Sequence, residues 1–263
     1  MALIRRNRLA RIAIGAVALI TGAAVATGCS SSGDHDRNGP HVVAASSWEA
    51  AFAKAAGASD VTVIVPAAIK HAPDYDPKPS DLATVAKADF VLYAQFEGFA
   101  GKIKDAAGSK AKLVEVNLDN VKDTMESEVR RLGDLFGTRT TADKWIVDFE
   151  TEYGKLATDV KTAWPGGQPP KVVQQAFMGF AAQLSGAQVL GTYGPAPITP
   201  GQVADLSAKN PQYVLGNEQM STGQVLPGSS AKQIDLTNYP TQDQDLLSVY
   251  RDAAAKLTAA MHG

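Results

Sequence analysis

Short runs rich in β-branched residues alternate with amphipathic stretches over most of this chain, and this alternation constrains the fold more than any other feature. It is typical of βαβ units, in which helices connect the parallel strands of a sheet. The expected strands are Val42–Ala45, Val61–Val65, Phe90–Tyr93 and Leu113–Val116, followed by Lys171–Gln175, Gln188–Thr192, Tyr213–Leu215 and Gln233–Leu236. The sequence therefore predicts an α/β protein with parallel sheets.

Helical stretches are expected between these strands. They lie near Trp48–Ala56, Ser80–Ala86, Gly98–Ala107, Met178–Leu184, Pro200–Ala208 and Asp243–Met261. Thr199 directly precedes Pro200, which favours a helix start because the hydroxyl caps the first turn and proline suits the first helical position.

A long helical region separates the two halves. Apolar residues recur at helical spacing from Val121 to Phe136, and Gly137 then interrupts the pattern. A second helix of about 24 residues, or about 36 Å, is expected to run from Thr140 or Thr141 to Trp164. We therefore expect two Rossmann-like lobes with parallel sheets, 41–137 and 167–263, joined by one long helix within 138–166 that allows little hinge motion.

The N-terminus carries an export signal. Four arginines precede an apolar run, Ile12–Val25, which is too short to span a bilayer as a stable helix. The run is followed by Ala26–Cys29, which resembles a lipobox. We expect a signal peptide over 1–28, a lipid on Cys29 and a flexible tether over 29–40. The protein would then be anchored at the extracytoplasmic face of the cell membrane. An ordinary transmembrane anchor is the alternative.

Composition narrows the function. Cys29 is the only cysteine, so no disulfide is expected within the chain and the fold must rest on its core. The formal net charge of −2 and the lack of a basic stripe argue against a nucleic-acid partner. The motifs of serine hydrolases, phosphate-binding loops and zinc proteases do not occur, so we expect a protein that is not an enzyme and that has no organic cofactor.

Several segments carry a resemblance to a known family. They are Val42–Ser46, Asp74–Asp81 (close to a motif HxYEPxPSD), Lys87–Val91, Glu97–Phe99 and Tyr193–Pro200. Together they resemble the cluster-A substrate-binding proteins of ABC importers, the helical-backbone family that includes zinc and manganese receptors, over nearly all of 41–261. The resemblance implies a receptor that captures zinc, manganese or iron and delivers it to a permease and its ATPase.

The histidines depart from that family. Zinc sites of the family commonly use three histidines. This chain has four histidines in total, and most of them lie where they cannot reach the expected cleft. His41 begins a strand, although ligands bind beyond the carboxyl ends of such strands. His71 follows the second strand and is the best candidate. A three-histidine zinc site is therefore not expected.

Loops after the strands supply the remaining candidates. His71, Glu97 and Glu218 would form a mixed nitrogen and oxygen site for a divalent transition metal, with zinc or manganese preferred. The surrounding cleft is expected to contain Trp48, Glu49, Asp74, Tyr75, Asn117, Gln175, Asn217 and Gln219.

Two other functions stay open. The aromatic residues expected in the cleft, Trp48, Phe96, Phe177, Tyr193 and Tyr239, would also suit an organic ligand such as a metal chelate or siderophore. The reduced histidine set would also fit a surface adhesin or accessory lipoprotein that keeps the fold without transport.

Overall fold

The computed structural model describes residues 39–66, 68–69, 72–221, 223–240 and 243–262. Cys29 and His71, the predicted lipidation site and histidine ligand, lie outside these residues. The described residues all belong to one compact unit that begins at Arg37. None of the helices in this described part is both long enough and apolar enough to cross a bilayer.

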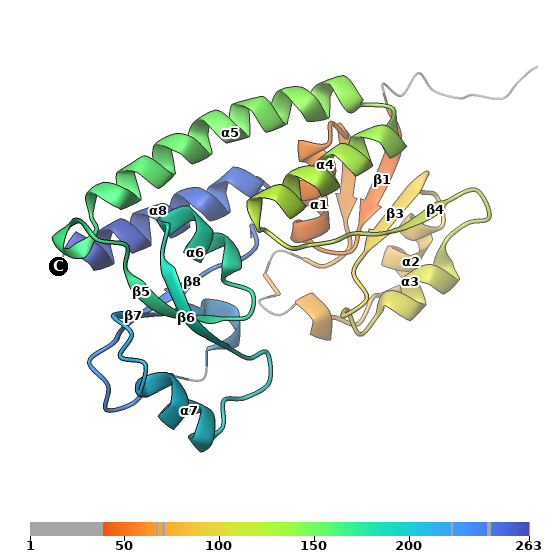
Figure 1. Ribbon diagram of the computed structural model, residues 1–263. Coiled ribbons are helices and arrows are strands. Elements are labelled where there is room, and N and C mark those ends of the chain that lie inside the picture. Colours follow the sequence, from red (N-terminus) through yellow and green to blue (C-terminus); the bar gives the residue numbers. More distant parts are fainter. Residues whose placement is uncertain (1–38, 67, 70–71, 222, 241–242, 263) are drawn as a thin grey trace, which may run out of the picture. The chain divides into compact units, whose positions relative to one another are not determined.

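The first sheet contains four parallel strands in the order β2-β1-β3-β4 (Figure 1). The strands are β1 (His41–Ala44), β2 (Asp60–Val63), β3 (Phe90–Tyr93) and β4 (Lys112–Glu115), and the connecting helices are α1 (Ser47–Ala55), α2 (Pro79–Val85) and α3 (Ala100–Ala106). Alternate strand residues face opposite sides of the sheet. Val42 of β1 packs in the core that contains α1, whereas Val43 packs in a second core with Val85 of α2 and Ile103 of α3.

The second sheet repeats this plan in the order β6-β5-β7-β8, again with all strands parallel. Its elements are β5 (Lys171–Gln175), α6 (Gly179–Ser185), β6 (Gln188–Tyr193), α7 (Pro200–Ser207), β7 (Tyr213–Asn217), β8 (Lys232–Leu236) and α8 (Leu246–His262). Thr199 caps α7 as expected, because its side chain accepts a hydrogen bond from the Gln202 N–H. The predicted α/β fold with two parallel sheets is confirmed.

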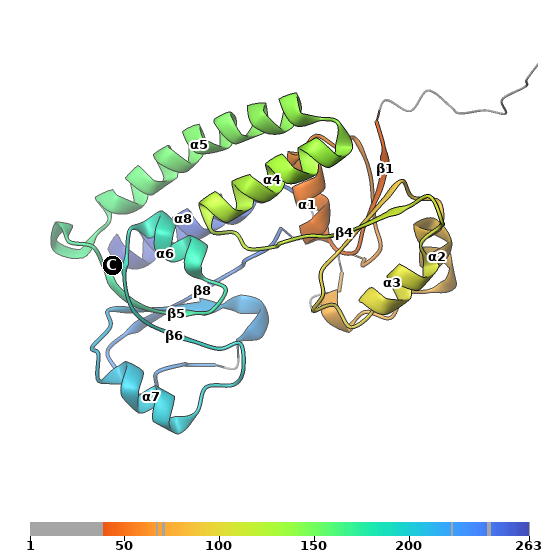
Figure 2. The same ribbon diagram turned by 45° about the vertical axis from the view of Figure 1, so that its right-hand side comes forward.

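Two long helices lie between the sheets in the sequence. They are α4 (Lys122–Phe136) and α5 (Arg139–Thr162), and Gly137 ends α4 in the left-handed conformation, with φ of 74°. The two helices pack closely at Gly133, where a Cβ atom would lie 2.6 Å from the Cβ of Ala142. In both views α5 extends from one sheet to the other (Figures 1 and 2).

One hydrophobic core runs through both lobes without a break. It includes Phe52 of α1, Met125 of α4 and Phe149 of α5, and it continues to Leu184 of α6 and Leu257 of α8. Rotating one lobe against the other would expose part of this core to water, at a cost of roughly 25 cal/mol for each Å² of apolar surface. The continuous core therefore accounts for the expectation that the lobes hinge little.

Candidate functional site

A cavity of about 1090 Å³ lies where the carboxyl ends of both sheets meet. The first lobe contributes loops after β1, β2, β3 and β4 together with part of α4, and the second lobe contributes loops after β5, β6, β7 and β8. We call this space the interlobe cavity. Its position is the one expected for a ligand site in parallel α/β sheets.

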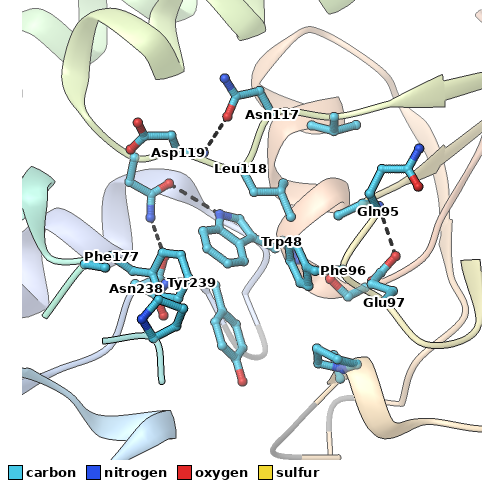
Figure 3. A pocket seen from close by; sticks show the side chains of 18 of the residues that line it. Trp48, Gln95, Phe96, Glu97, Asn117, Leu118, Asp119, Phe177, Asn238 and Tyr239 are labelled. Carbon is cyan, nitrogen blue, oxygen red and sulfur yellow. Dashed lines mark hydrogen bonds between the residues drawn. The ribbon is translucent and has the colours of Figure 1, made fainter. Parts of the chain in front are cut away.

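Aromatic and amide contacts close the base of the cavity between the lobes. Trp48 stacks on Tyr239 with ring centroids 5.5 Å apart, and its indole N–H donates to Asn120 Oδ1 at 3.3 Å. The Asn120 amide in turn donates to the Asn238 carbonyl, and the Asn120 carbonyl accepts from the Tyr250 hydroxyl at 2.5 Å. Figure 3 shows the Trp48 ring next to that of Tyr239. Asn120 thus connects α1 of the first lobe with α8 and with the loop after β8 of the second lobe.

Two buried glutamates follow the neighbouring strands β1 and β3 in the same local arrangement. Glu49 Oε2 accepts hydrogen bonds from the Ser46 backbone N–H at 3.0 Å and the Ser46 hydroxyl at 2.5 Å. Glu97 Oε2 accepts from the Ala94 N–H at 3.0 Å. Glu49 is fully buried and Glu97 is 3% exposed, yet Glu97 lines the interlobe cavity.

The electrostatics of this pair favour a proton or another cation. Burial, followed by the nearby carboxyl of Glu49, raises the pKa of Glu97 to about 9. Burial also raises the pKa of Glu49, whereas its hydrogen bonds with Ser46 lower it by less. Glu49 Oε1 is buried and has no hydrogen-bond partner among the residues that the structure describes. A buried carboxyl without a counter-charge keeps its proton because ionisation in a poorly solvated place is costly.

A charged pair on α4 forms another part of the cavity wall. Arg131 donates to both carboxylate oxygens of Glu128, at 2.7 and 2.6 Å. Glu128 also accepts from the Asn117 backbone N–H at 3.0 Å, and Arg131 donates to the Glu115 carbonyl at 2.9 Å. These contacts tie α4 to the loop after β4. Four carboxyl side chains and one guanidinium line the described wall: Glu97, Glu115, Asp119, Glu128 and Arg131.

Amides dominate the polar groups of the second lobe. Asn217 Oδ1 accepts from the Gln219 N–H at 3.0 Å, and its Nδ2 lies 3.4 Å from Asn238 Oδ1. Gln219 Oε1 is buried and finds no hydrogen-bond partner within the described part of the chain. Gln175 is buried behind the wall, where its Oε1 accepts from the Phe177 N–H at 2.6 Å.

Large apolar side chains stand exposed in the cavity wall. Phe96 is 59% exposed and Phe177 47% exposed, and Met220 is 38% exposed. Phe96 comes from the first lobe and the other two from the second. Figure 3 places Phe96 and Phe177 on opposite sides of Trp48. The cavity therefore presents apolar surface from both lobes to whatever enters it.

The structure brings some of the predicted residues to the cavity and not others. Trp48, Glu97, Asn117, Asn217 and Gln219 line it, as do the predicted aromatic residues Phe96, Phe177 and Tyr239. The other predicted cleft residues, Glu49, Asp74, Tyr75 and Gln175, are not in the lining, and neither is Tyr193.

The predicted cleft residues of the first lobe that do not line the cavity lie in its local structure or at its surface. Glu49 caps α1. The Tyr75 hydroxyl donates to Asp81 at 2.8 Å and its ring meets Phe99 edge to face. Asp74 is exposed at the end of a short 3₁₀ helix, η1 (Ala72–Asp74). The contacts of Glu49 and Tyr75 thus belong to the local structure of the first lobe.

Glu218, a predicted metal ligand, does not line the interlobe cavity. Its carboxylate binds Lys256 of α8 at 2.7 Å and accepts from the Thr237 hydroxyl at 3.1 Å. The hydrogen bond with Lys256 lowers the pKa of Glu218. Glu218 begins another 3₁₀ helix, η3 (Glu218–Met220), in which its neighbours Gln219 and Met220 face the cavity instead. The side chain is therefore part of a surface ion pair.

Sequence reasoning did not identify Asn120, Arg131 or Met220 as wall residues. Asn120 lies after β4, as Asn117 does, so the rule that ligands bind beyond strand ends could have found it. Glu128 and Arg131 are three residues apart on α4, which puts them on one helix face. That spacing alone does not tell which side of the helix faces a cavity.

The described residues supply carboxyl and amide groups to the cavity but no complete metal cluster. Within the described ranges, no group of three His, Cys, Asp or Glu side chains converges to hold a metal ion. His41 lies at the amino end of β1, where its Nδ1 is 3.0 Å from Asp60 Oδ2. His41 therefore lies at the end of the first sheet opposite the interlobe cavity, as its place at the start of the strand predicted.

Solved structures with the same fold are binding proteins. FpvC from Pseudomonas aeruginosa, a substrate-binding protein in complex with Ni²⁺, matches with a TM-score of 0.62 and 14% identity over 84% of this chain and 96% of its own. The laminin-binding protein Lmb of Streptococcus agalactiae, described as an adhesin with metal-transporting activity, matches with a TM-score of 0.62 and 18% identity over 85% and 100%.

A third solved structure extends the comparison. The Mn-bound periplasmic metal-binding protein from Candidatus Liberibacter asiaticus matches with a TM-score of 0.60 and 12% identity over 84% of this chain and 99% of its own. No known family model matches the sequence, and no curated protein is detectably related to it by sequence. At these identities the likeness establishes a shared fold, as the resemblance implied.

Proposed function

We propose that this chain is the substrate-binding protein of an ABC importer, which captures a divalent transition metal in the interlobe cavity and delivers it to the permease and its ATPase. One observation carries the proposal: strand-end loops of both lobes form a single acid-rich cavity, with the Glu97 carboxyl in its wall. Proteins with the same fold bind Ni²⁺ and Mn²⁺. Binding and release require no chemical step, so the protein would act as a receptor rather than as an enzyme.

Glu97 and His71 are the proposed metal ligands. Glu97 is supported by its buried position at the end of β3 and by its interaction with Glu49. A cation next to this pair would stabilise the ionised carboxylates, which burial otherwise disfavours. Hard and borderline divalent metals accept carboxylate and amide oxygens together with imidazole, so Asn117 and Gln219 are suited to complete the surroundings. Glu218 is not included because it pairs with Lys256.

Replacing Glu97 by Gln is expected to weaken binding of Zn²⁺ or Mn²⁺ by at least about 100-fold. Even mutation of a residue that only hydrogen-bonds a metal ligand typically lowers metal affinity by about 10- to 100-fold. Protein purified without chelator is assayed by elemental analysis and then by competition titration. Asp105→Asn, an exposed carboxylate on α3, is the matched control and should bind like wild type. If wild-type protein retains no transition metal in any form, the proposed function is wrong.

We further propose that the protein is attached to the extracytoplasmic face of the membrane by a lipid on Cys29. Replacing Cys29 by Ala is expected to move the protein from the membrane fraction to the soluble fraction, because an acyl chain contributes about 0.8 kcal/mol of membrane affinity for each buried CH₂ group. Cell fractionation followed by mass spectrometry of the N-terminus checks this result. An uncleaved wild-type chain with no acyl group on Cys29 would indicate a transmembrane anchor instead.

A further inference from the structure

The interlobe cavity is much larger than a metal ion. Its volume of about 1090 Å³ lies just above the range of about 300–1,000 Å³ for sites that enclose whole organic ligands. Both lobes contribute to its wall, so this space belongs to the site and not to one surface loop. The size of the cavity points to an occupant with the dimensions of a small organic molecule.

Apolar side chains in the wall would contact such an occupant. Phe96 is 59% exposed, Phe177 47% and Met220 38%. Large exposed apolar side chains that gather at one place usually mark a binding surface. A hydrated ion gains nothing from these side chains, whereas an aromatic or aliphatic ligand would remove them from water. Trp48 and Tyr239 extend this surface across the base of the cavity.

The charges of the wall restrict the occupant further. Arg131 is held by Glu128 through two hydrogen bonds, so its positive charge is already compensated. Glu115 and Asp119 add carboxyl groups, and no lysine lines the described wall. An anionic complex would be repelled by this excess of acidic groups, whereas a neutral or cationic complex would be attracted.

We propose that the metal enters the interlobe cavity inside a neutral or cationic complex with a small organic chelator, whose apolar body packs between Phe96 and Phe177. This inference rests on the proposed function and names the form in which the metal is captured. In this form the chelator occupies the positions next to the metal that Glu97 and His71 would take on a bare ion, and the protein recognises the outer surface of the complex through apolar contact and through its acidic and amide groups.

Equilibrium dialysis with inert metal complexes tests this inference on the full chain. The probe is the iron(II) tris(2,2′-bipyridine) dication, a cationic complex with an aromatic surface. Hexaamminecobalt(III) has positive charge without apolar surface, and iron(III)–EDTA is anionic. We expect the bipyridine complex to bind and the other two to bind at least about tenfold more weakly, since a single well-packed aromatic anchor is worth more than 1 kcal/mol.

Variants locate the contact. Phe96→Ala and Phe177→Ala are each expected to weaken binding of the bipyridine complex by about tenfold, and both should fold normally because the side chains are exposed. Val147→Ala is the matched control, since Val147 is 61% exposed on α5 and outside the cavity. It should leave binding unchanged.

The outcomes separate this inference from the proposed function. Tight binding of bare Zn²⁺ or Mn²⁺ without binding of the bipyridine complex overturns the inference and leaves the proposed function intact. The inference is also overturned if hexaamminecobalt(III) binds as tightly as the bipyridine complex. It is overturned as well if neither Phe96→Ala nor Phe177→Ala weakens binding of the bipyridine complex. The same holds if the metal-free N,N′-dimethyl-4,4′-bipyridinium dication binds as tightly as the iron complex. Failure of every metal form to bind contradicts the proposed function itself.

Discussion

Raising the pH from 5 to 8 is expected to lower the free energy of unfolding of the metal-free protein by about 4 kcal/mol. Burial and the neighbouring Glu49 carboxyl raise the pKa of Glu97 to about 9, from an ordinary value of 4.5. Between these two values the unfolded chain loses a proton that the folded chain keeps, so rising pH favours unfolding. The stabilising contribution is complete below pH 4.5 and is lost as the pH approaches 9.

Urea denaturation at both pH values measures this effect. Glu97→Gln should remove the part of the pH dependence that Glu97 contributes, because the amide has a similar shape and does not ionise. Glu49, whose pKa burial also raises, keeps its own part. Asp105→Asn, which replaces an exposed carboxylate of α3, should keep the dependence of wild type. If the Glu97 variant loses as much stability between pH 5 and pH 8 as wild type does, then Glu97 is ionised in the folded protein and the assignment of a protonated pair is wrong.

Replacing Tyr250 by Ala is expected to lower the free energy of unfolding by about 4 kcal/mol, because it leaves a cavity in the part of the core that joins the lobes. Tyr250 is fully buried. Its ring meets Phe149, Tyr153 and Phe180 with centroid distances of 5.0, 5.9 and 5.6 Å. Its hydroxyl donates to the carbonyl of Asn120, so the same substitution should also loosen the base of the interlobe cavity.

A pair of conservative variants separates packing from hydrogen bonding. Tyr250→Phe keeps the ring and is expected to cost about 1–2 kcal/mol, because the Asn120 carbonyl loses a buried partner. Tyr75→Phe removes a hydroxyl that donates to Asp81 at a partly exposed place, where water can replace it, and should cost less than 1 kcal/mol by the same reasoning. Chemical denaturation measures both. Equal losses for Tyr250→Ala and Tyr75→Phe would mean that the core at Tyr250 does not connect the lobes.

Local sequence patterns predicted the strands and helices well. The long helix was expected from Thr140 or Thr141 to Trp164 and occupies Arg139–Thr162, since Gly137 and Pro165 mark its limits in the sequence itself. The β7 strand extends to Asn217 rather than ending at Leu215, because its pairing with β8 continues through Leu236. Pairing partners distant in the sequence set such boundaries, and local patterns do not contain them.

The site was only partly predictable for the same kind of reason. The position beyond the strand ends follows from topology, and it correctly brings Trp48, Asn117 and Asn217 to the cavity. The direction of each side chain does not follow from topology. Glu218 turns away because Lys256, 38 residues further along the chain, provides an ion pair on α8. Glu49 completes a capping box with Ser46, and its complete burial depends on how α1 packs on the sheet.

The separation between a continuous core and a wall built of loops makes ligand choice and fold stability nearly independent. Phe96, Phe177 and Met220 can change without disturbing the packing around Tyr250, since they lie outside the core cluster. Substitutions at these three positions would therefore change the apolar surface of the cavity with little effect on fold stability. The same fold is found in solved structures that share only 12–18% sequence identity with this chain.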